Sequence, residues 1–177
     1  PPFHVAHQVG QEILDIARQR VGVPLWVPWP PPRGWLVTGF LTAGDERTGG
    51  LACAVALSGP SLVSGPADML LVAEEIGSGL GAYIAGLDGP DPGGVFAASP
   101  PHAKPEVRGH PVPLWAVRSA PEDRAVYVGE ALGHWLWAVL WPSEAGVLML
   151  EELHLRDLRD PDMELDLPYG AMCPRLA

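Results

Sequence analysis

Cysteine is scarce in this chain, and its scarcity excludes a disulfide-stabilised scaffold. Only two of the 177 residues are cysteines, Cys53 and Cys173, and neither belongs to a Cys-x-x-C pair. The six histidines show no zinc-ligand spacing either, so the sequence predicts no metal site in this segment. Two isolated thiols are typical of a protein from a reducing compartment, and we expect a cytoplasmic location.

Basic residues and long apolar runs are also lacking. Eleven basic residues stand against 21 acidic ones, which gives a formal net charge of −10. A chain with no cationic stripe cannot neutralise many phosphates, so we expect no nucleic-acid partner. No apolar run reaches the roughly 18 residues that a membrane-spanning helix needs, and an acidic surface is repelled by anionic lipids. We therefore expect no membrane partner.

Proline and glycine, by contrast, are abundant. The chain holds 21 of each, so it must turn often, which favours short strands over long helices. Apolar residues make up 47% of the chain, enough for the core of one domain over residues 1–177. The first residues are Pro1 and Pro2 rather than a methionine, so we expect a processed or trimmed chain.

An internal repeat predicts the architecture. The tetrapeptide Val-Pro-Leu-Trp at 23–26 returns at 112–115, and three apolar blocks follow each copy in the same order. The blocks lie at 36–39, 54–57 and 70–76 after the first copy, and at 125–129, 137–140 and 147–153 after the second. Four blocks in register predict a duplicated unit of one Pro-Leu-Trp arm and three antiparallel strands.

The expected elements make a β-rich α+β domain. Apolar spacing predicts a helix over 8–21, and a shorter helix is expected at 79–87. Strands are expected at 35–43, 51–58 and 69–75, and again at 112–118, 124–131, 134–141 and 146–152. We expect the domain to be divided into an N-terminal helical lead at 1–23, a first repeat unit at 24–87, a Pro/Gly-rich joint at 88–111, and a second repeat unit with its tail at 112–177. The two units would form either a sandwich or a partly closed barrel.

A glycine-rich loop after the third strand is a candidate phosphate site. Gly77, Gly79 and Gly81, followed by Ala82, match the G-x-G-x-x-A form of a dinucleotide loop. Two acidic residues at 74–75 would repel a phosphate, and the flanking pattern lacks alternating strands and helices. A tight turn that packs a short helix is therefore the favoured interpretation, and no cofactor is expected.

Acidic pairs at 74–75 and 151–152 occupy equivalent places in the two predicted units. If the units pack about a two-fold axis, these carboxylates could bind a metal or share a proton. Adjacent strand residues face opposite sides, so only one of each pair could point inward, and solvated strand ends are the simpler interpretation. Glu75 and Glu152 are the candidates for a polar group in a pocket between the units.

Tryptophan supplies the remaining candidate surface. Trp29 and Trp35 lie on the first proline-rich arm. Trp135, Trp137 and Trp141 alternate along the strand expected at 134–141, so one face of that strand is heavily aromatic. The leading expectation is a non-catalytic binding or regulatory module that engages another protein near Trp29 and Trp135. The alternative is a small-molecule-binding protein or an enzyme with a Trp-lined pocket between the two units. A homodimer with tryptophans in its interface is a third interpretation.

The chain also resembles a known family. The segments that carry the resemblance are Trp26, the Trp29-Pro30 step, 34–36, 71–75, 88–93 and 135–138. They resemble an uncharacterised family of high-GC Gram-positive bacteria over nearly all of residues 20–177, and the resemblance implies no established activity. It implies an N-terminal zinc ribbon of paired Cys-x-x-C, and hence zinc, in a segment that this chain lacks. Some relatives carry the label phosphotransacetylase, which no residue here supports and the acidic charge opposes.

Overall fold

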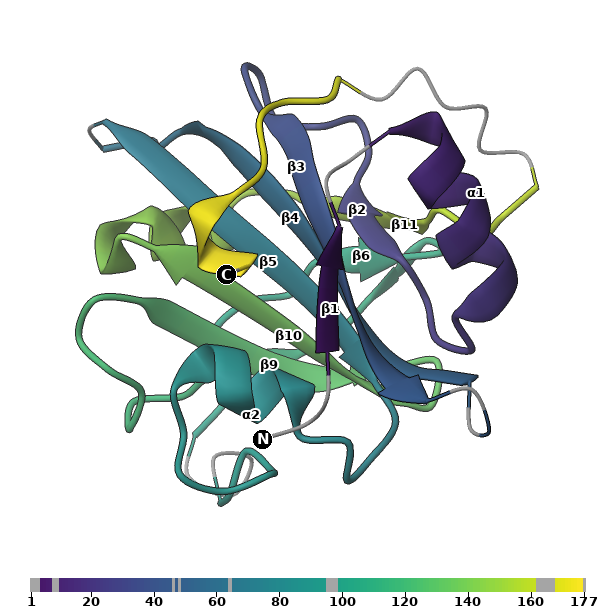
Figure 1. Ribbon diagram of the computed structural model, residues 1–177. Helices are drawn as coiled ribbons and strands as arrows, with labels where there is room; N and C mark the ends of the chain where they lie inside the picture. The colour runs from purple at the N-terminus through teal and green to yellow at the C-terminus, as the bar shows by residue number, and fades with distance from the viewer. Residues whose placement is uncertain are drawn as a thin grey trace.

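The computed structural model of the chain describes residues 4–7, 10–45, 47, 49–63, 65–94, 99–161 and 168–176. The larger of its two sheets has the order β1-β3-β4-β5-β10-β9-β8, with every neighbouring pair antiparallel (Figure 1). Its strands are β1 (His4–His7), β3 (Leu36–Asp45), β4 (Gly49–Pro60), β5 (Pro66–Glu74), β10 (His134–Trp141), β9 (Ala125–Ala131) and β8 (Leu114–Ala116). Since β1 and β8 end the order, this sheet is open rather than a closed barrel.

A smaller sheet has the order β2-β11-β6-β7. Its strands are β2 (Trp26–Pro28), β11 (His154–Asp157), β6 (Glu106–Val107) and β7 (His110–Pro111). Strand β11 runs antiparallel to β2 and parallel to β6. This sheet therefore brings together three segments that are far apart in the sequence.

The helices are short. They are α1 (Gln11–Arg20), α2 (Leu80–Ala85) and the 3₁₀ helices η2 (Ser143–Leu150) and η3 (Pro174–Leu176). The helices expected over 8–21 and 79–87 are confirmed as α1 and α2, although residues 8 and 9 lie outside the described residues. No helix in the described part of the chain is long and apolar enough to cross a membrane.

Two apolar clusters lie on opposite faces of the larger sheet, because alternate strand residues point to opposite sides. In β5, Met69 and Leu71 join a cluster with α1 and the smaller sheet. Leu70 and Val72 join the other cluster, with α2 and the C-terminal residues. The fold therefore has the smaller sheet and α1 on one face of the larger sheet and α2 on the other, which confirms the β-rich part of the predicted class (Figure 1).

The strand predicted at 146–152 is wrong, since residues 143–150 form the 3₁₀ helix η2. Ala145 and Leu148 are buried, whereas Val147 and Leu150 are exposed, and this spacing of three is the 3₁₀ period. Gly146 permits the close packing, because a Cβ there would lie 2.7 Å from the Cβ of Ala125 on β9. A short apolar run fits a strand and a buried helix equally well, so the sequence pattern alone did not separate them.

The duplication inferred from the sequence blocks is not confirmed. Two three-stranded meanders, β3-β4-β5 and β8-β9-β10, do lie side by side through the β5–β10 pair. The matched blocks do not follow them, however. Block 70–76 lies largely on β5, whereas its counterpart at 147–153 covers the end of η2 and the residues after it. The Val-Pro-Leu-Trp arm likewise leads into β2 of the smaller sheet in one copy and β8 of the larger sheet in the other.

Candidate functional site

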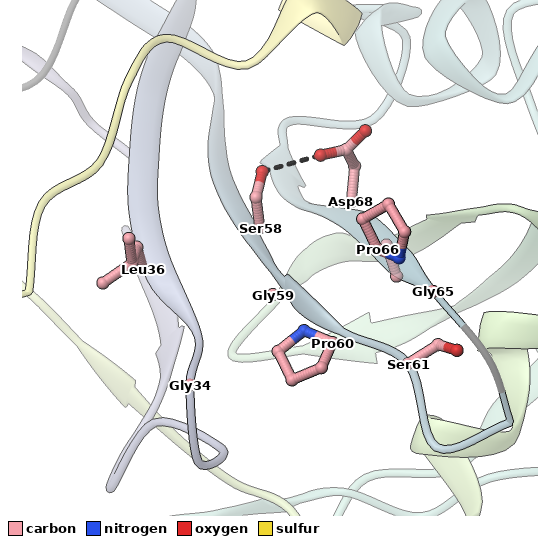
Figure 2. A pocket seen from close by; sticks show the side chains of 10 residues that line it. Gly34, Leu36, Ser58, Gly59, Pro60, Ser61, Gly65, Pro66 and Asp68 are labelled. Atoms are coloured by element: carbon pink, nitrogen blue, oxygen red, sulfur yellow. Dashed lines mark hydrogen bonds between the residues drawn. The ribbon is translucent and has the colours of Figure 1, made fainter.

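An open groove lies between the start of β3 and the β4–β5 hairpin (Figure 2). Its volume is about 540 Å³. Glycine, proline, serine and alanine make up most of its lining, with Leu36 on one wall and Asp68 as the charged lining residue. Such a surface offers shape and apolar contact rather than an array of polar groups.

The polar end of the groove is internally bonded. The Asp68 carboxylate accepts a 2.6 Å hydrogen bond from the Ser58 hydroxyl, whose oxygen lies 3.2 Å from Thr38 Oγ1. Arg175 of the C-terminal segment donates to the other Asp68 oxygen at 3.4 Å. These contacts tie β3, β4, β5 and the C-terminal segment together.

Trp35 supports the groove from beneath. Its ring packs against Gly59, where an added Cβ would lie 2.5 Å from Trp35 Cγ. Its indole nitrogen donates to the Pro60 carbonyl at 3.1 Å, and the side chain is buried. Trp35 therefore holds the β4–β5 hairpin in place and is not itself presented to a ligand.

Large apolar side chains are exposed around the groove. Leu62 and Val63, in the turn between β4 and β5, are 56% and 63% exposed. Leu36, on the facing wall, is 39% exposed. Three such side chains beside one open groove form a surface that water solvates poorly. We call this groove, together with Leu62 and Val63 of the turn that follows its lining residue Ser61, the hairpin groove.

A second exposed cluster lies where β6 and β11 run in parallel. His154 stands opposite Glu106 in the ladder, and its Nδ1 lies 3.0 Å from Glu106 Oε2. On the other side of the ring, Nε2 lies 3.6 Å from Glu152 Oε1. One ligand atom from each residue falls within 4.8 Å of the other two. Trp29 borders this cluster, since its backbone N–H donates to the His154 carbonyl at 2.8 Å.

The buried Glu74 carboxylate lies at the N-terminus of α2. One oxygen accepts from the Ser78 hydroxyl at 2.6 Å and from the Gly81 N–H at 3.0 Å. The other accepts from the Trp137 indole nitrogen at 2.7 Å. Glu74 thus takes the place at this helix end that a phosphate takes in a dinucleotide loop.

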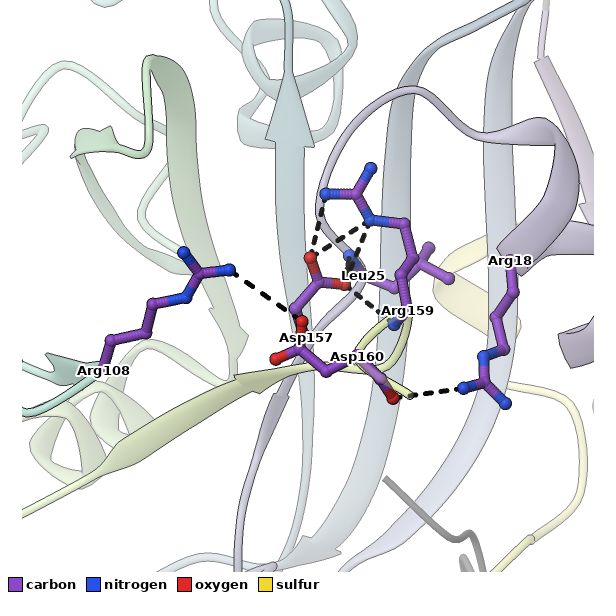
Figure 3. A network of polar contacts seen from close by, with 6 residues as sticks. All are labelled: Arg18, Leu25, Arg108, Asp157, Arg159 and Asp160. Atoms are coloured by element: carbon purple, nitrogen blue, oxygen red, sulfur yellow. Dashed lines mark hydrogen bonds and ion pairs between the residues drawn. The ribbon is translucent and has the colours of Figure 1, made fainter. Parts of the chain in front are cut away.

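A further polar network surrounds Asp157 on β11 (Figure 3). Its carboxylate accepts from the Leu25 N–H at 3.0 Å, from the Arg159 N–H at 2.9 Å and from the Arg159 guanidinium at 2.9 Å. Burial alone would raise the pKa of Asp157, but the hydrogen bonds from Arg159 and Leu25 outweigh it and hold that pKa below its usual range. The network fixes the chain just before β2 to the end of β11.

The same corner also ties in α1 and the β6–β7 turn. The Asp160 carbonyl accepts from the Arg18 guanidinium of α1 at 3.2 Å. The Asp160 carboxylate lies 3.9 Å from the Arg108 guanidinium, whose side chain is largely exposed (Figure 3). These bonds join segments of the fold, so this corner is structural.

One family matches the chain over almost its whole length. The model of a family of unknown function, DUF6758, matches residues 1–176. The chain belongs to this family. No curated protein and no solved structure matches it. The DUF6758 family carries no assigned activity, so the surfaces of the fold are the evidence for its function.

The three tryptophans singled out in this DUF6758 chain lie in different places. Trp35 is buried under the hairpin groove. Trp29 is half-buried and packs on the cluster between the sheets, whereas Trp135 packs on the cluster that α2 covers. Trp29 and Trp135 therefore lie on opposite sides of the larger sheet and do not share one surface.

The two predicted glutamates also lie apart in the fold. Glu75 follows β5 and is exposed, and Glu152 precedes β11 in the smaller sheet. The pocket is expected where the two units meet. The two meanders meet along the β5–β10 ladder, in which the seven residues from Trp135 to Trp141 are paired with β5. The glycines of the loop serve the α2 turn: Gly77 and Gly79 have positive φ, and a Cβ at Gly81 would overlap the Trp137 indole.

Sequence reasoning missed several residues that the structure brings together. Asp68 and Ser58 lie on neighbouring strands, and only the β4–β5 register pairs them. Glu106 lies in the predicted joint, so no local pattern linked it to His154. The Glu152-x-His154 spacing was the available signal, because alternate residues of an extended chain face the same side.

Proposed function

We propose that this domain is a non-catalytic binding module that engages another protein through the hairpin groove. The observation that carries the proposal is one open groove with exposed Leu36 in its lining, next to the β4–β5 turn that exposes Leu62 and Val63. Exposed apolar side chains that cluster beside a groove mark interaction surfaces more often than isolated ones do. The polar clusters at Glu74 and Asp157 are bonded internally and do not compete as binding sites.

The shape of the groove favours a polypeptide over a small molecule. Small-molecule sites bury most of the ligand in a concave cavity with a few convergent polar groups. The hairpin groove is open, and the Ser58 and Asp68 groups at its end already bond to each other. An extended peptide segment gains affinity from a shallow apolar groove, since its contacts spread along the segment.

The charge of the chain specifies the kind of partner. The net charge of −10 repels acidic proteins and attracts basic ones, which raises the rate of encounter. The occupant is therefore an extended apolar segment of a partner protein, flanked by basic residues. Such a complex weakens as salt is added, because its charges are exposed and screened.

Site-specific photo-crosslinking in the native host tests the proposal. A photoreactive phenylalanine analogue replaces Val63 in the full chain, and crosslinked partners are identified by mass spectrometry. The matched control places the analogue at Ile76, which is 72% exposed and lies after β5 rather than in the hairpin. We expect one protein to crosslink at position 63 and not at 76.

Substitution then tests the surface directly with the identified partner. Leu62→Ser with Val63→Ser should weaken binding at least tenfold, while Ile76→Ser changes it less than twofold. Equal binding by all three proteins would refute the groove as the docking surface. Crosslinking of the chain to itself would support the homodimer, and a retained small-molecule mass in native mass spectrometry would support the small-molecule alternative.

The proposal also covers the cellular location of the module and the segment that precedes it. The free thiols of Cys53 and Cys173 are both buried, which suits a reducing cytoplasm. The resemblance to high-GC Gram-positive proteins supports a bacterial module that follows a zinc ribbon. Elemental analysis and the intact mass of the protein purified from its host test this: a heavier chain that carries zinc is expected.

A further inference from the structure

We propose that His154 and Glu152, oriented by Glu106, form a surface binding site for a divalent transition metal ion of the zinc class. This site is separate from the hairpin groove and does not depend on the protein-binding function. It joins the start of β11 to β6, two strands of the smaller sheet. Within the described part of the chain, these three side chains are the group with metal-ligand spacing.

The spacing between His154 and Glu152 carries the argument. Nε2 and Glu152 Oε1 face each other at 3.6 Å, which is too long for a hydrogen bond. Two ligands of a tetrahedral zinc ion, each bonded at about 2.1 Å, lie about 3.4 Å apart. The two atoms are therefore already at nearly the separation that one shared ion imposes.

Glu106 holds the imidazole in the form that binds metal. Its carboxylate lies 3.0 Å from Nδ1, so the neutral ring carries its proton on Nδ1 and donates it to Glu106. Nε2, which lies 3.6 Å from Glu152 Oε1, is then the unprotonated nitrogen that can bind a metal ion. A carboxylate that accepts from the distal nitrogen of a metal-bound histidine is a recurrent arrangement, and it raises the basicity of the ligand nitrogen.

The chemistry of the donors selects the ion. One imidazole nitrogen and carboxylate oxygens suit zinc and its first-row neighbours better than calcium, which prefers oxygen ligands alone. The two carboxylates together balance the charge of a divalent ion. The side chains of His154 and Glu152 are 48% and 81% exposed, so water or an added ligand can complete the coordination.

Titration of the untagged, metal-free chain of residues 1–177 with zinc chloride tests the site. Calorimetry gives the number of ions bound, and long-range ¹H–¹⁵N spectra of the histidine rings report which imidazole changes. We expect one equivalent of zinc to shift the His154 Nε2 resonance. His154→Ala and Glu152→Gln should each lower the affinity for this zinc ion at least tenfold. Glu106→Gln should lower the same affinity about tenfold.

His110→Ala is the matched control, because His110 is exposed on the neighbouring strand β7 of the same sheet. It should leave the zinc affinity within twofold of the parent chain. Thermal melts without zinc check that every variant is folded, and added zinc should raise the melting temperature of the parent chain but not that of His154→Ala. Zinc binding that His154→Ala leaves unchanged, or no shift of the His154 ring, would overturn the proposal.

Discussion

The Glu74 carboxylate accepts a 2.7 Å hydrogen bond from the Trp137 indole nitrogen across the ladder that joins β5 to β10. Both side chains are fully buried, on the face of the sheet that α2 covers. Glu74 stands directly opposite Trp135 in the register, so Trp137 reaches it diagonally. The bond joins the two meanders at the point where α2 begins.

Glu74→Gln should lower the free energy of unfolding by about 1–3 kcal/mol. The carboxylate accepts from three donors, on Ser78, Gly81 and Trp137, whereas an amide offers one acceptor oxygen and adds two donors of its own. Urea unfolding followed by tryptophan fluorescence measures the change. The control is Glu75→Gln at the exposed neighbouring position, which should stay within about 0.5 kcal/mol of the parent. Equal stability of both variants would contradict a structural role for Glu74.

Gly81→Ala should destabilise the fold by about 1–3 kcal/mol through overpacking. A Cβ at position 81 overlaps the Trp137 indole, which is enclosed and cannot move aside. The same substitution at Gly94, where nothing lies within 4 Å, is the control and should have little effect. Thermal melting of the two variants side by side measures the difference, and a Gly81→Ala protein as stable as the control would refute this packing.

Local patterns predicted much of the fold. Helix α1 and strands β3, β4, β5, β9 and β10 all lie where apolar periodicity placed them. Tryptophans 135, 137 and 141 also share one face of β10, as their spacing predicts. These elements could be predicted because helix α1 has a regular apolar spacing and the inner strands are short apolar runs buried on both faces, so the signal lies within each element's own residues.

The smaller sheet and the candidate sites could not be predicted in this way. Strands β6 and β7 have two residues each, too few to show a period. Glu74 and Trp137 meet only because β5 pairs with β10, and Asp68 meets Arg175 only because the C-terminal segment crosses the sheet. Such contacts depend on register between distant segments, on which a single sequence carries little information.

Asp157→Ala should lower the free energy of unfolding by about 2–3 kcal/mol at neutral pH, because it leaves the Leu25 N–H and the Arg159 guanidinium without their acceptor. The pKa of Asp157 is lower in the folded chain than in the unfolded one. The unfolded state therefore takes up the proton first as the pH falls. The stabilisation is complete above the unfolded pKa of about 3.9 and is lost as the pH falls through the lower, folded pKa.

Denaturant unfolding of the parent and the Asp157→Ala variant between pH 7 and pH 2 measures this difference. The difference in free energy of unfolding between the parent and the variant should be constant down to about pH 4 and should shrink below that pH. Asp160→Asn is the control, since that carboxylate lies 3.9 Å from a largely exposed arginine and should contribute less than about 1 kcal/mol. A difference in free energy of unfolding that widens toward low pH would contradict a lowered pKa of Asp157 in the folded chain.

The side chain of Arg175 helps to hold the C-terminal segment against the larger sheet, beside the backbone hydrogen bonds of residues 168–173. The Arg175 guanidinium lies 5.2 Å from the Trp141 ring centroid and donates to Asp68 at 3.4 Å. Cys173, two residues earlier, is buried, and its N–H donates to the Thr38 carbonyl. Burial raises the pKa of the Cys173 thiol, so at neutral pH it is protonated as well as inaccessible.

Arg175→Ala should therefore speed thiol labelling at Cys173 while leaving Cys53 protected. Cys53 lies on β4 in the centre of the larger sheet, so it is exposed only when the whole domain unfolds, whereas Cys173 needs only the C-terminal segment to lift. Timed iodoacetamide labelling with peptide mass spectrometry gives both rates. The control is Arg108→Ala, whose guanidinium pairs with Asp160 and makes no contact with this segment in the described residues. Equal acceleration of labelling at both cysteines by Arg175→Ala would contradict this prediction. It would mean that the segment opens only when the whole domain unfolds, and that Arg175 stabilises the whole fold rather than the C-terminal segment alone.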